Sequence, residues 1–123
     1  MLIKVSELTG AALAWAVAEA DGTFAGPYDK TFKVINGKLY LMLNGSVMVH
    51  PCEPQESWAQ GGPIIEREKM AIMLCESVGD WLADLSGTDK VFTASGSTPL
   101  IAAMRCYVAS KLGDTVEIPE ELK

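Results

Sequence analysis

Two Asn-Gly dipeptides punctuate the stretch Thr31-Phe-Lys-Val-Ile-Asn-Gly-Lys-Leu-Tyr-Leu-Met-Leu-Asn-Gly-Ser-Val-Met-Val-His50. Asn-Gly supplies the two positive φ angles of a type I′ turn, whose twist matches that of paired strands. The stretch therefore predicts a three-stranded antiparallel meander, with strands at residues 31–35, 38–43 and 46–50.

The middle strand of this meander alternates between leucines and more polar side chains. We expect the leucines to face the core, because successive side chains of a strand point to opposite faces. The other face is only half polar, so another element or a second subunit is expected to cover it. The leucines are Leu39, Leu41 and Leu43, and the alternating set is Lys38, Tyr40 and Met42.

The first helix is predicted over residues 7–20. Ser6 suits the N-cap position, and Gly22 follows the last helical residue. Apolar side chains recur at helical spacing along one face. They are Leu8, Ala11, Ala12, Trp15 and Ala18, and Leu13 and Val17 widen the face so that most of the helix is expected to be covered.

A second helix is predicted over residues 99–112. Thr98 is a typical N-cap residue, Pro99 suits the first helical position and Gly113 suits the end. The side expected to be buried carries Leu100, Ile101, Met104, Val108 and Leu112.

Further strands are predicted at residues 70–74 and 81–85, joined as a second hairpin. The tail is extended and is expected to pack back through Val116 and Ile118. The prediction is one compact α+β domain over residues 1–123. It has an antiparallel sheet of about five strands, built from hairpins, on two main helices.

Charge and length limit the classes of function. The chain has 123 residues and a formal net charge of −6. Nucleic-acid binders usually carry basic patches, so binding to nucleic acid is not expected. The start of the chain does not resemble a secretory signal, and the longest apolar stretch, near residues 11–18, is too short to cross a bilayer. We therefore expect a cytoplasmic protein without membrane contact.

Recognisable catalytic and metal-binding motifs are missing from the sequence. Cys52, Cys75 and Cys106 are too far apart for a Cys-x-x-Cys site and are expected to be buried free thiols. His50 stands two residues before Cys52, and accidental proximity is favoured over a nucleophile pair because no third orienting residue is evident. No catalytic residue, metal ligand or cofactor is predicted, although paired carboxylates of a small hydrolase stay open.

The segment Trp58-Ala-Gln60-Gly61-Gly62-Pro63 is the first candidate for a binding site. Consecutive glycines let backbone amides approach a ligand, and the Trp58 indole offers a stacking face. The segment is expected to be irregular at its glycines, with Pro63 opening a short helix. The structural alternative is a tight turn with Trp58 in the core.

The hydroxyl-rich segment before the second predicted helix is the other candidate. Ser95, Ser97 and Thr98 precede a helix N-terminus, which presents unpaired N–H groups to anions. Arg105, nearly two turns along the helix, would add a positive charge to the same pocket, or pair with a surface acid instead. An ordinary capped helix is the structural alternative.

Three blocks of this sequence resemble the NinX-like family of tailed-phage and prophage proteins. They are Val5-Ser-Glu-Leu-Thr-Gly-Ala-Ala-Leu-Ala-Trp-Ala-Val-Ala18, Trp58-Ala-Gln-Gly-Gly-Pro-Ile-Ile-Glu-Arg67 and Thr98-Pro-Leu-Ile-Ala-Ala-Met-Arg-Cys-Tyr-Val-Ala-Ser-Lys-Leu-Gly-Asp114. Residues 24–50 lie outside these blocks, and the meander is interpreted there as a local elaboration. The resemblance implies a small phage accessory protein expressed in a bacterial cytoplasm, and it implies no activity.

A non-enzymatic binder that sequesters a small anionic ligand, such as a nucleotide signal of host defence, is the favoured hypothesis. Its pocket is expected to use seven residues, with a homo-oligomer closing over the ligand. An acidic interaction module that binds a host protein is the alternative, and a small hydrolase is the third hypothesis. The expected ligand contacts are Trp58, Gln60, Gly61, Gly62, Ser97, Thr98 and Arg105.

Overall fold

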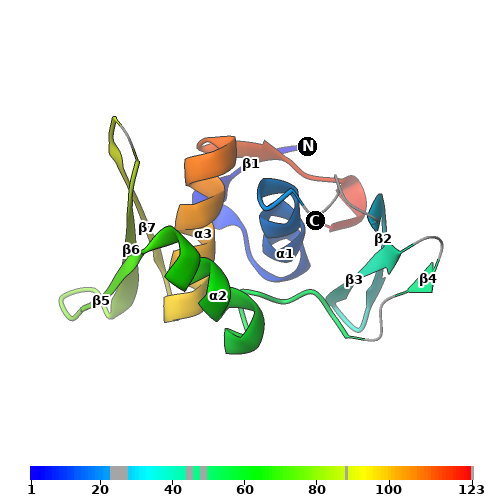
Figure 1. Ribbon diagram of the computed structural model, residues 1–123, viewed down its shortest axis with the longest axis horizontal. Coiled ribbons are helices and arrows are strands. Elements are labelled where there is room, and N and C mark those ends of the chain that lie inside the picture. Colours follow the sequence, from blue (N-terminus) through cyan, green and yellow to red (C-terminus); the bar gives the residue numbers. More distant parts are fainter. Residues whose placement is uncertain (23–27, 44–45, 48–49, 88, 123) are drawn as a thin grey trace.

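The computed structural model describes residues 1–22, 28–43, 46–47, 50–87 and 89–122. Within them the chain has an α+β fold with three α-helices and eight strands (Figure 1). In chain order the elements are β1 (Leu2–Lys4), the 3₁₀ turn η1 (Val5–Glu7), α1 (Gly10–Ala20), β2 (Tyr28–Ile35), β3 (Lys38–Leu43), β4 (Ser46–Val47), α2 (Trp58–Glu68), β5 (Ala71–Cys75), β6 (Asp80–Ser86), β7 (Val91–Gly96), α3 (Pro99–Leu112), β8 (Thr115–Glu117) and the 3₁₀ turn η3 (Glu120–Leu122).

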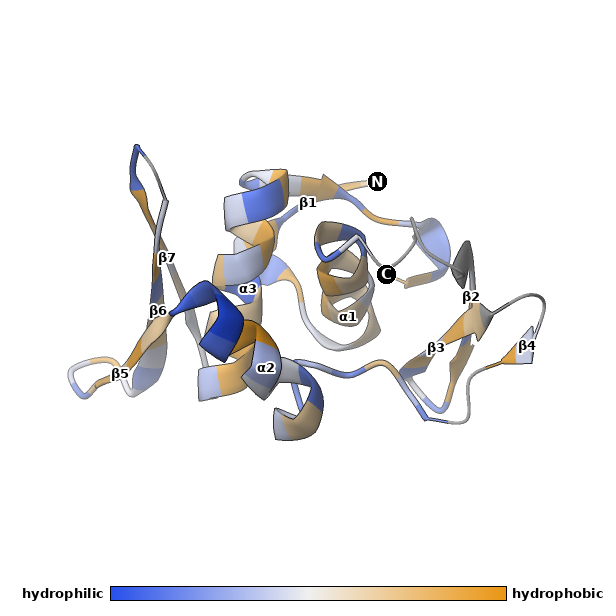
Figure 2. Ribbon diagram, in the orientation of Figure 1, coloured by the Kyte–Doolittle hydropathy of each residue, from blue (hydrophilic) through white to orange (hydrophobic). Residues whose placement is uncertain are grey.

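Two central helices, α1 and α3, are flanked by sheets on opposite sides (Figure 1). The sheet β5-β6-β7 packs on α3, and β3 of the sheet β2-β3-β4 contacts α1. The short pair β1-β8 is antiparallel, as are both larger sheets. Figure 2 shows that α1 is apolar along most of its length, whereas the last turn of α2 is strongly hydrophilic. The core therefore lies around α1 and α3.

The predicted order of three antiparallel strands is confirmed as β2-β3-β4. The third strand was predicted over residues 46–50, but β4 is Ser46–Val47, residues 48–49 lie outside the described residues and His50 is not part of the strand. Asn36 and Gly37 have φ angles of 53° and 77°, as a type I′ turn requires. The core-facing leucines Leu39 and Leu41 are buried. β2 begins earlier than expected, at Tyr28, and its register with β3 shifts between Tyr28 and Phe32. The second Asn-Gly turn, residues 44–45, lies outside the described residues, and so does the side chain of Leu43.

The second hairpin is also confirmed, and it gains a strand that the sequence did not indicate. β5 pairs with β6, and β6 pairs in turn with β7. Residues 94–96 therefore lie in a strand rather than in a loop before the helix. Gly96 explains the close packing of this strand, because a Cβ atom there would lie 2.7 Å from the backbone nitrogen of Ala102. The glycine is needed for packing of β7 on α3.

The first helix begins later than predicted. Leu8 and Thr9 are extended, and Gly10 has a φ of +55°. The extended residues Leu8 and Thr9 separate the turn at Val5–Glu7 from α1, which begins at Gly10, and Thr9 replaces Ser6 as N-cap. Extensive burial of α1 is confirmed. Its buried residues are Ala12, Leu13, Ala14, Ala16, Val17 and Ala18.

The second predicted helix, α3, has the predicted bounds and cap. The Thr98 hydroxyl accepts a hydrogen bond of 3.1 Å from the Ile101 N–H. The extended tail is confirmed as β8, and both Val116 and Ile118 are buried. Of the predicted stripe, Ile101 and Leu112 are only half-buried, whereas burial extends to other sides of α3 because both the sheet and α1 contact it. The buried set is Leu100, Ala102, Ala103, Met104, Cys106, Tyr107 and Val108.

The predicted irregular segment at Gly61 and Gly62 is wrong, since α2 runs through both glycines and through Pro63. Glycine and proline are the poorest helix formers, so tertiary packing overrides local preference here. Gly61 packs against Pro54 and against Leu100 of α3, where a Cβ atom would overlap both residues. The fold therefore has a third helix, and eight strands rather than about five, among the described residues.

Candidate functional site

A groove of about 340 Å³ lies where the first turns of α2 and α3 meet. It brings Trp58 and Thr98 together, two residues that are 40 positions apart in the chain and that the sequence assigned to one pocket. The other lining residues are Gln55, Glu56, Pro99, Leu100 and Ile101. A volume of this size falls at the lower end of small-ligand sites.

Trp58 is the first residue of α2, and 57% of its surface is exposed. An exposed indole at the mouth of a groove offers an apolar face on which a planar ring can stack. The expectation that Trp58 might belong to the core is wrong. Because the indole is largely exposed, truncating it should remove ligand contacts without opening a cavity.

The start of α3 supplies polar groups to the same groove. The Thr98 oxygen accepts from Ile101, but its hydroxyl hydrogen stays available to a ligand. Leu100, the second helical residue, has an N–H group with no acceptor inside the helix. Pro99 has no N–H group. Thr98 and Leu100 can therefore offer two donors.

The remaining polar residues of the groove are acceptors. Gln55 is only 4% exposed, and its Nε2 donates to the Gly10 carbonyl over 3.0 Å. The Gln55 Oε1 is buried and makes no hydrogen bond within the described chain. Glu56 is exposed and adds a negative charge. None of the described lining residues is basic.

The two glycines contribute to packing rather than to an open amide cradle. The Gly61 N–H donates to the Ser57 carbonyl over 2.8 Å, as the helix requires. Gly62 is half-buried and has open space beside it. Neither glycine is among the described residues that line the groove.

Gln60 points to another part of the molecule. Its Oε1 accepts from the Glu53 N–H over 2.7 Å, and its Nε2 donates to the Pro51 carbonyl over 2.9 Å. Both ends of the amide are thereby engaged in holding residues 51–53 against α2. Gln60 lines a separate cavity of about 140 Å³ beside Asp21 and Cys52.

Arg105 connects two backbone segments and lies outside the groove's described lining. Its Nε donates to the Leu8 carbonyl and its Nη1 donates to the Ser95 carbonyl, each over 2.9 Å. Ser97 is exposed next to Thr98, and it too is absent from that lining. Of the seven expected contact residues, the groove therefore unites Trp58 and Thr98.

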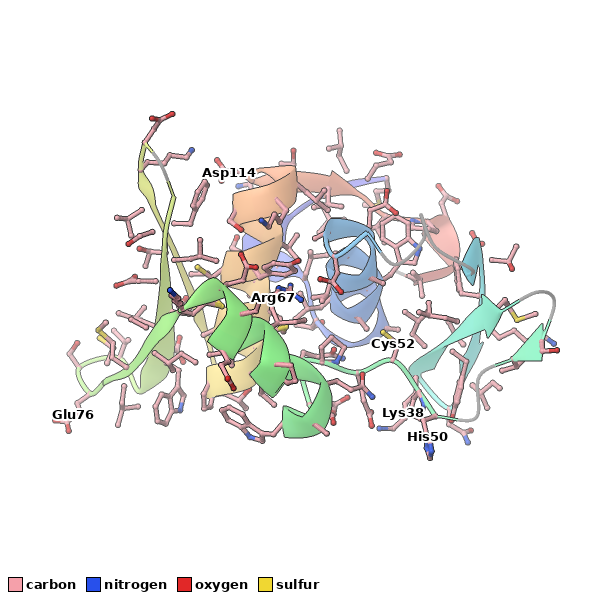
Figure 3. The ribbon with its side chains drawn as sticks, viewed as in Figure 1. Lys38, His50, Cys52, Arg67, Glu76 and Asp114 are labelled. Atoms are coloured by element: carbon pink, nitrogen blue, oxygen red, sulfur yellow. The ribbon has the colours of Figure 1, made fainter. Side chains whose placement is uncertain are left out.

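His50 and Cys52 do not form a nucleophile pair. The Cys52 N–H donates to the Leu39 carbonyl over 2.7 Å, and burial raises the pKa of the Cys52 thiol to about 11. A raised pKa lowers the thiolate fraction at neutral pH. Figure 3 shows His50 at the edge of the molecule, directed away from Cys52.

All three cysteines are free, as expected, but only one of them is fully buried. Cys106 is buried, whereas Cys52 and Cys75 are partly accessible. Among the described residues, no cluster of three or more histidine, cysteine or carboxylate side chains has the arrangement of a metal site. No described helix is both long and apolar enough to span a bilayer.

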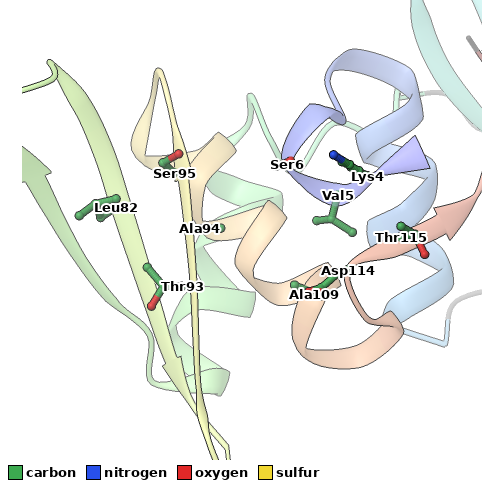
Figure 4. Close-up of a pocket in the computed structure, with 10 residues that line it drawn as sticks. All are labelled: Lys4, Val5, Ser6, Leu82, Thr93, Ala94, Ser95, Ala109, Asp114 and Thr115. Atoms are coloured by element: carbon green, nitrogen blue, oxygen red, sulfur yellow. The ribbon is translucent and has the colours of Figure 1, made fainter. Parts of the chain in front are cut away.

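A larger groove of about 440 Å³ lies on the other side of the molecule, between β7 and the segment Lys4–Ser6 (Figure 4). Sequence reasoning missed it, because it depends on β7 and on the position of the N-terminal segment. The available sequence signal was the alternation of Thr93 and Ser95 with the less polar Phe92 and Ala94.

Comparison with known families assigns the chain. The family described as bacteriophage P22 NinX matches residues 4–111. This chain belongs to that phage family. The match includes the groove residues Trp58 and Thr98, and its range also spans residues 24–50. No curated protein matches the sequence. Membership of the family indicates a phage accessory protein and specifies no activity.

Proposed function

We propose that this chain is a non-enzymatic binding protein that captures a small ligand with a planar ring in the groove between Trp58 and the start of α3. The observation that carries the proposal is the exposed Trp58 indole beside a groove of about 340 Å³. In a phage protein, a nucleotide signal of host defence is a ligand of this kind, and sequestering it would protect the phage.

Stacking is the main interaction in this proposal. Stacking of a base on an aromatic side chain contributes about 1–3 kcal/mol. The Gln55 Oε1, as a buried acceptor without a partner in the described chain, suits an N–H group of such a ring after a small local adjustment. A phosphate group would accept hydrogen bonds from the Thr98 hydroxyl and the Leu100 N–H. The Glu56 carboxylate would repel a negatively charged ligand.

A homo-oligomer completes the proposal. Trp58 lies at the surface, so a ring stacked on it would have one face covered by this chain. A second copy that covers the other face would increase capture without any change in the groove. Light scattering with and without ligand tests this part, and a ligand-induced increase in mass is expected.

Isothermal titration calorimetry with adenosine, AMP and cyclic dinucleotides tests the proposal. Trp58→Ala should weaken binding by about 5- to 150-fold, because it removes the stacking energy. Met73→Ala, which truncates another exposed apolar side chain outside the groove's described lining, is the matched control and should bind normally. Absence of heat with every compound would end the proposal.

Glu56→Gln separates ring recognition from charge recognition. Removing this carboxylate should strengthen binding of AMP and leave adenosine unchanged, since only AMP carries a phosphate. Equal effects on both ligands would show that the ring, rather than the phosphate, contacts this part of the groove.

A protein-interaction module is the second candidate. Met73, Leu74 and Val78, on β5 and the turn after it, are 44%, 48% and 69% exposed. Met73 and Leu74 are consecutive in β5 and therefore point to opposite faces of the sheet, so each face carries an exposed apolar side chain there. Exposed apolar surface is typical of protein-binding sites. This candidate predicts a stable host partner in pull-downs, lost on Leu74→Asp and retained on Trp58→Ala.

A further inference from the structure

β7 is an edge strand, because the order β5-β6-β7 leaves one of its sides without a neighbour. That free side borders the groove of about 440 Å³ described above. Figure 4 shows β7 on one side of this groove and Lys4–Ser6 on the other. Ala109 of α3 also lines it, and none of these residues belongs to the groove around Trp58.

The register fixes which backbone groups of β7 face the groove. Paired residues of antiparallel strands alternate between exchanging both backbone hydrogen bonds and exchanging none. The Gly87 N–H donates to the Lys90 carbonyl over 2.8 Å and closes the turn between β6 and β7. Gly87 and Lys90 are a hydrogen-bonded pair, and the alternation continues along β7 from there. The backbone N–H and C=O groups that point away from β6 are therefore those of Val91, Thr93 and Ser95.

Two contacts support this assignment independently. The Ser95 carbonyl accepts from the Arg105 Nη1 over 2.9 Å, which agrees with a carbonyl that is not bonded to β6. The Thr93 hydroxyl donates to Asp84 over 2.8 Å across the sheet, and side chains approach most closely at pairs without backbone bonds. Arg105 thereby occupies the edge at Ser95. Within the described chain, the backbone groups of Thr93 have no partner.

The opposite wall presents backbone groups of the same kind. β1 pairs with β8, and the Val5 N–H donates to the Asp114 carbonyl over 2.9 Å. The same alternation turns the backbone groups of Lys4 away from β8. Each wall of the groove therefore has a strand residue, Thr93 or Lys4, whose backbone groups are not used within its own sheet.

We infer that this groove binds an extended segment of another protein, which pairs as an added strand with the free edge of β7. Unpaired backbone groups in a row select another backbone, which is the chemistry of strand addition. Inward side chains of the segment would meet Val5 and Ala109, so they are apolar. Lys4 is the one cation among the described lining residues. Asp114 in the wall, Asp84 beside Thr93 and the net charge of −6 outweigh it and favour basic outward side chains.

Thr93→Pro tests the inference, with Thr93→Ala as the matched control. Proline removes the N–H group that faces the groove and fills the edge with its ring, whereas alanine changes the side chain alone. We expect Thr93→Pro to fold, since proline is tolerated on edge strands where the lost N–H makes no bond to the neighbouring strand. The probe is a short peptide of alternating valine and lysine residues with blocked termini. Its binding site on the protein is mapped from changes in NMR chemical shifts.

The expected result is a set of shifts confined to Val91–Ser95 and Lys4–Ser6. Thr93→Pro should weaken binding by about tenfold or more, and Thr93→Ala by less than about twofold. N-methylation of alternate peptide nitrogens should weaken binding of the wild-type protein by a similar factor, which tests backbone pairing without changing the protein. A valine-glutamate peptide should bind more weakly than the valine-lysine peptide.

Several outcomes would overturn the inference. Shifts elsewhere, or equal binding by Thr93→Pro, would exclude pairing at β7. If Thr93→Pro unfolds through its fixed φ angle, the N-methylated peptides decide, and binding that N-methylation leaves unchanged would exclude backbone pairing. A dimer of the free protein that Thr93→Pro dissociates would make a second copy the occupant instead of a different protein.

Discussion

Gly61 packs so closely against Pro54 that a Cβ atom on the glycine would overlap the Pro54 carbonyl oxygen. The same Cβ atom would lie 2.8 Å from the Cδ2 of Leu100. This contact joins the start of α2 to α3, and it thereby positions Trp58 beside Thr98. The glycine that suggested a ligand loop is therefore needed to build the groove rather than to contact a ligand.

Gly61→Ala should destabilise the protein by about 1–3 kcal/mol, because the backbone of Pro54 must move to admit a methyl group. Gly62→Ala is the control, since no atom lies within 4 Å of its Cβ position. Alanine is a better helix former, so this control should be neutral or stabilising by up to about 1 kcal/mol. Urea denaturation measures both, and equal effects would contradict the packing role of Gly61.

Tyr107 should make stability fall at alkaline pH. Burial, followed by the hydrogen bond to Asp21, raises the pKa of the Tyr107 hydroxyl to about 12, above its ordinary value of 10.0. Ionisation is then easier in the unfolded chain. The stabilising contribution is complete below about pH 10 and is lost as pH rises towards about 12. Denaturation curves across this range should show a smaller loss for Tyr107→Phe than for the wild-type protein.

Arg105→Met should destabilise the fold without changing the affinity for a ligand at Trp58. The substitution leaves the carbonyls of Leu8 and Ser95 without their donor, and we expect a loss of about 1–3 kcal/mol. Lys111→Met removes an exposed cation from the same helix and should cost less than about 1 kcal/mol. If the Arg105→Met protein were fully folded and still bound the ligand more weakly, Arg105 would have to be counted as part of the ligand site.

The three cysteines should differ in reactivity. The contact with Ser77 lowers the pKa of the exposed Cys75 thiol, whereas burial raises the pKa values of Cys52 and Cys106 to about 11. Native protein treated with iodoacetamide near pH 8 should therefore be alkylated first at Cys75, as peptide mass mapping can show. First alkylation at Cys52 would mean that the cavity beside Gln60 opens readily.

The sequence predicted the elements that have local turn and cap signals. Asn36-Gly37 identified the first turn of the meander, and Thr98-Pro99 identified the start of α3, because these residues act through their own backbone conformation. α2 was missed because Gly61 and Pro63 disfavour a helix locally, and only contact with Pro54 and Leu100 compensates.

The same distinction applies to the candidate site. Trp58 and Thr98, which residue type suggested as contacts of one pocket, do line the same groove. Gln60 and Arg105 have the right chemistry for a ligand, but their donors and acceptors are used by backbone groups that are near only after folding. No local sequence pattern reveals that a side chain will hydrogen-bond to a backbone group brought near it by folding.

Native mass spectrometry tests the central claim most directly. The protein should be purified gently from bacteria in which a nucleotide-based defence has been induced, together with Trp58→Ala and the Met73→Ala control. We predict a bound low-mass species in the wild-type and Met73→Ala proteins that is lost in Trp58→Ala. A spectrum without any bound species, or one that Trp58→Ala leaves unchanged, would contradict ligand capture in this groove.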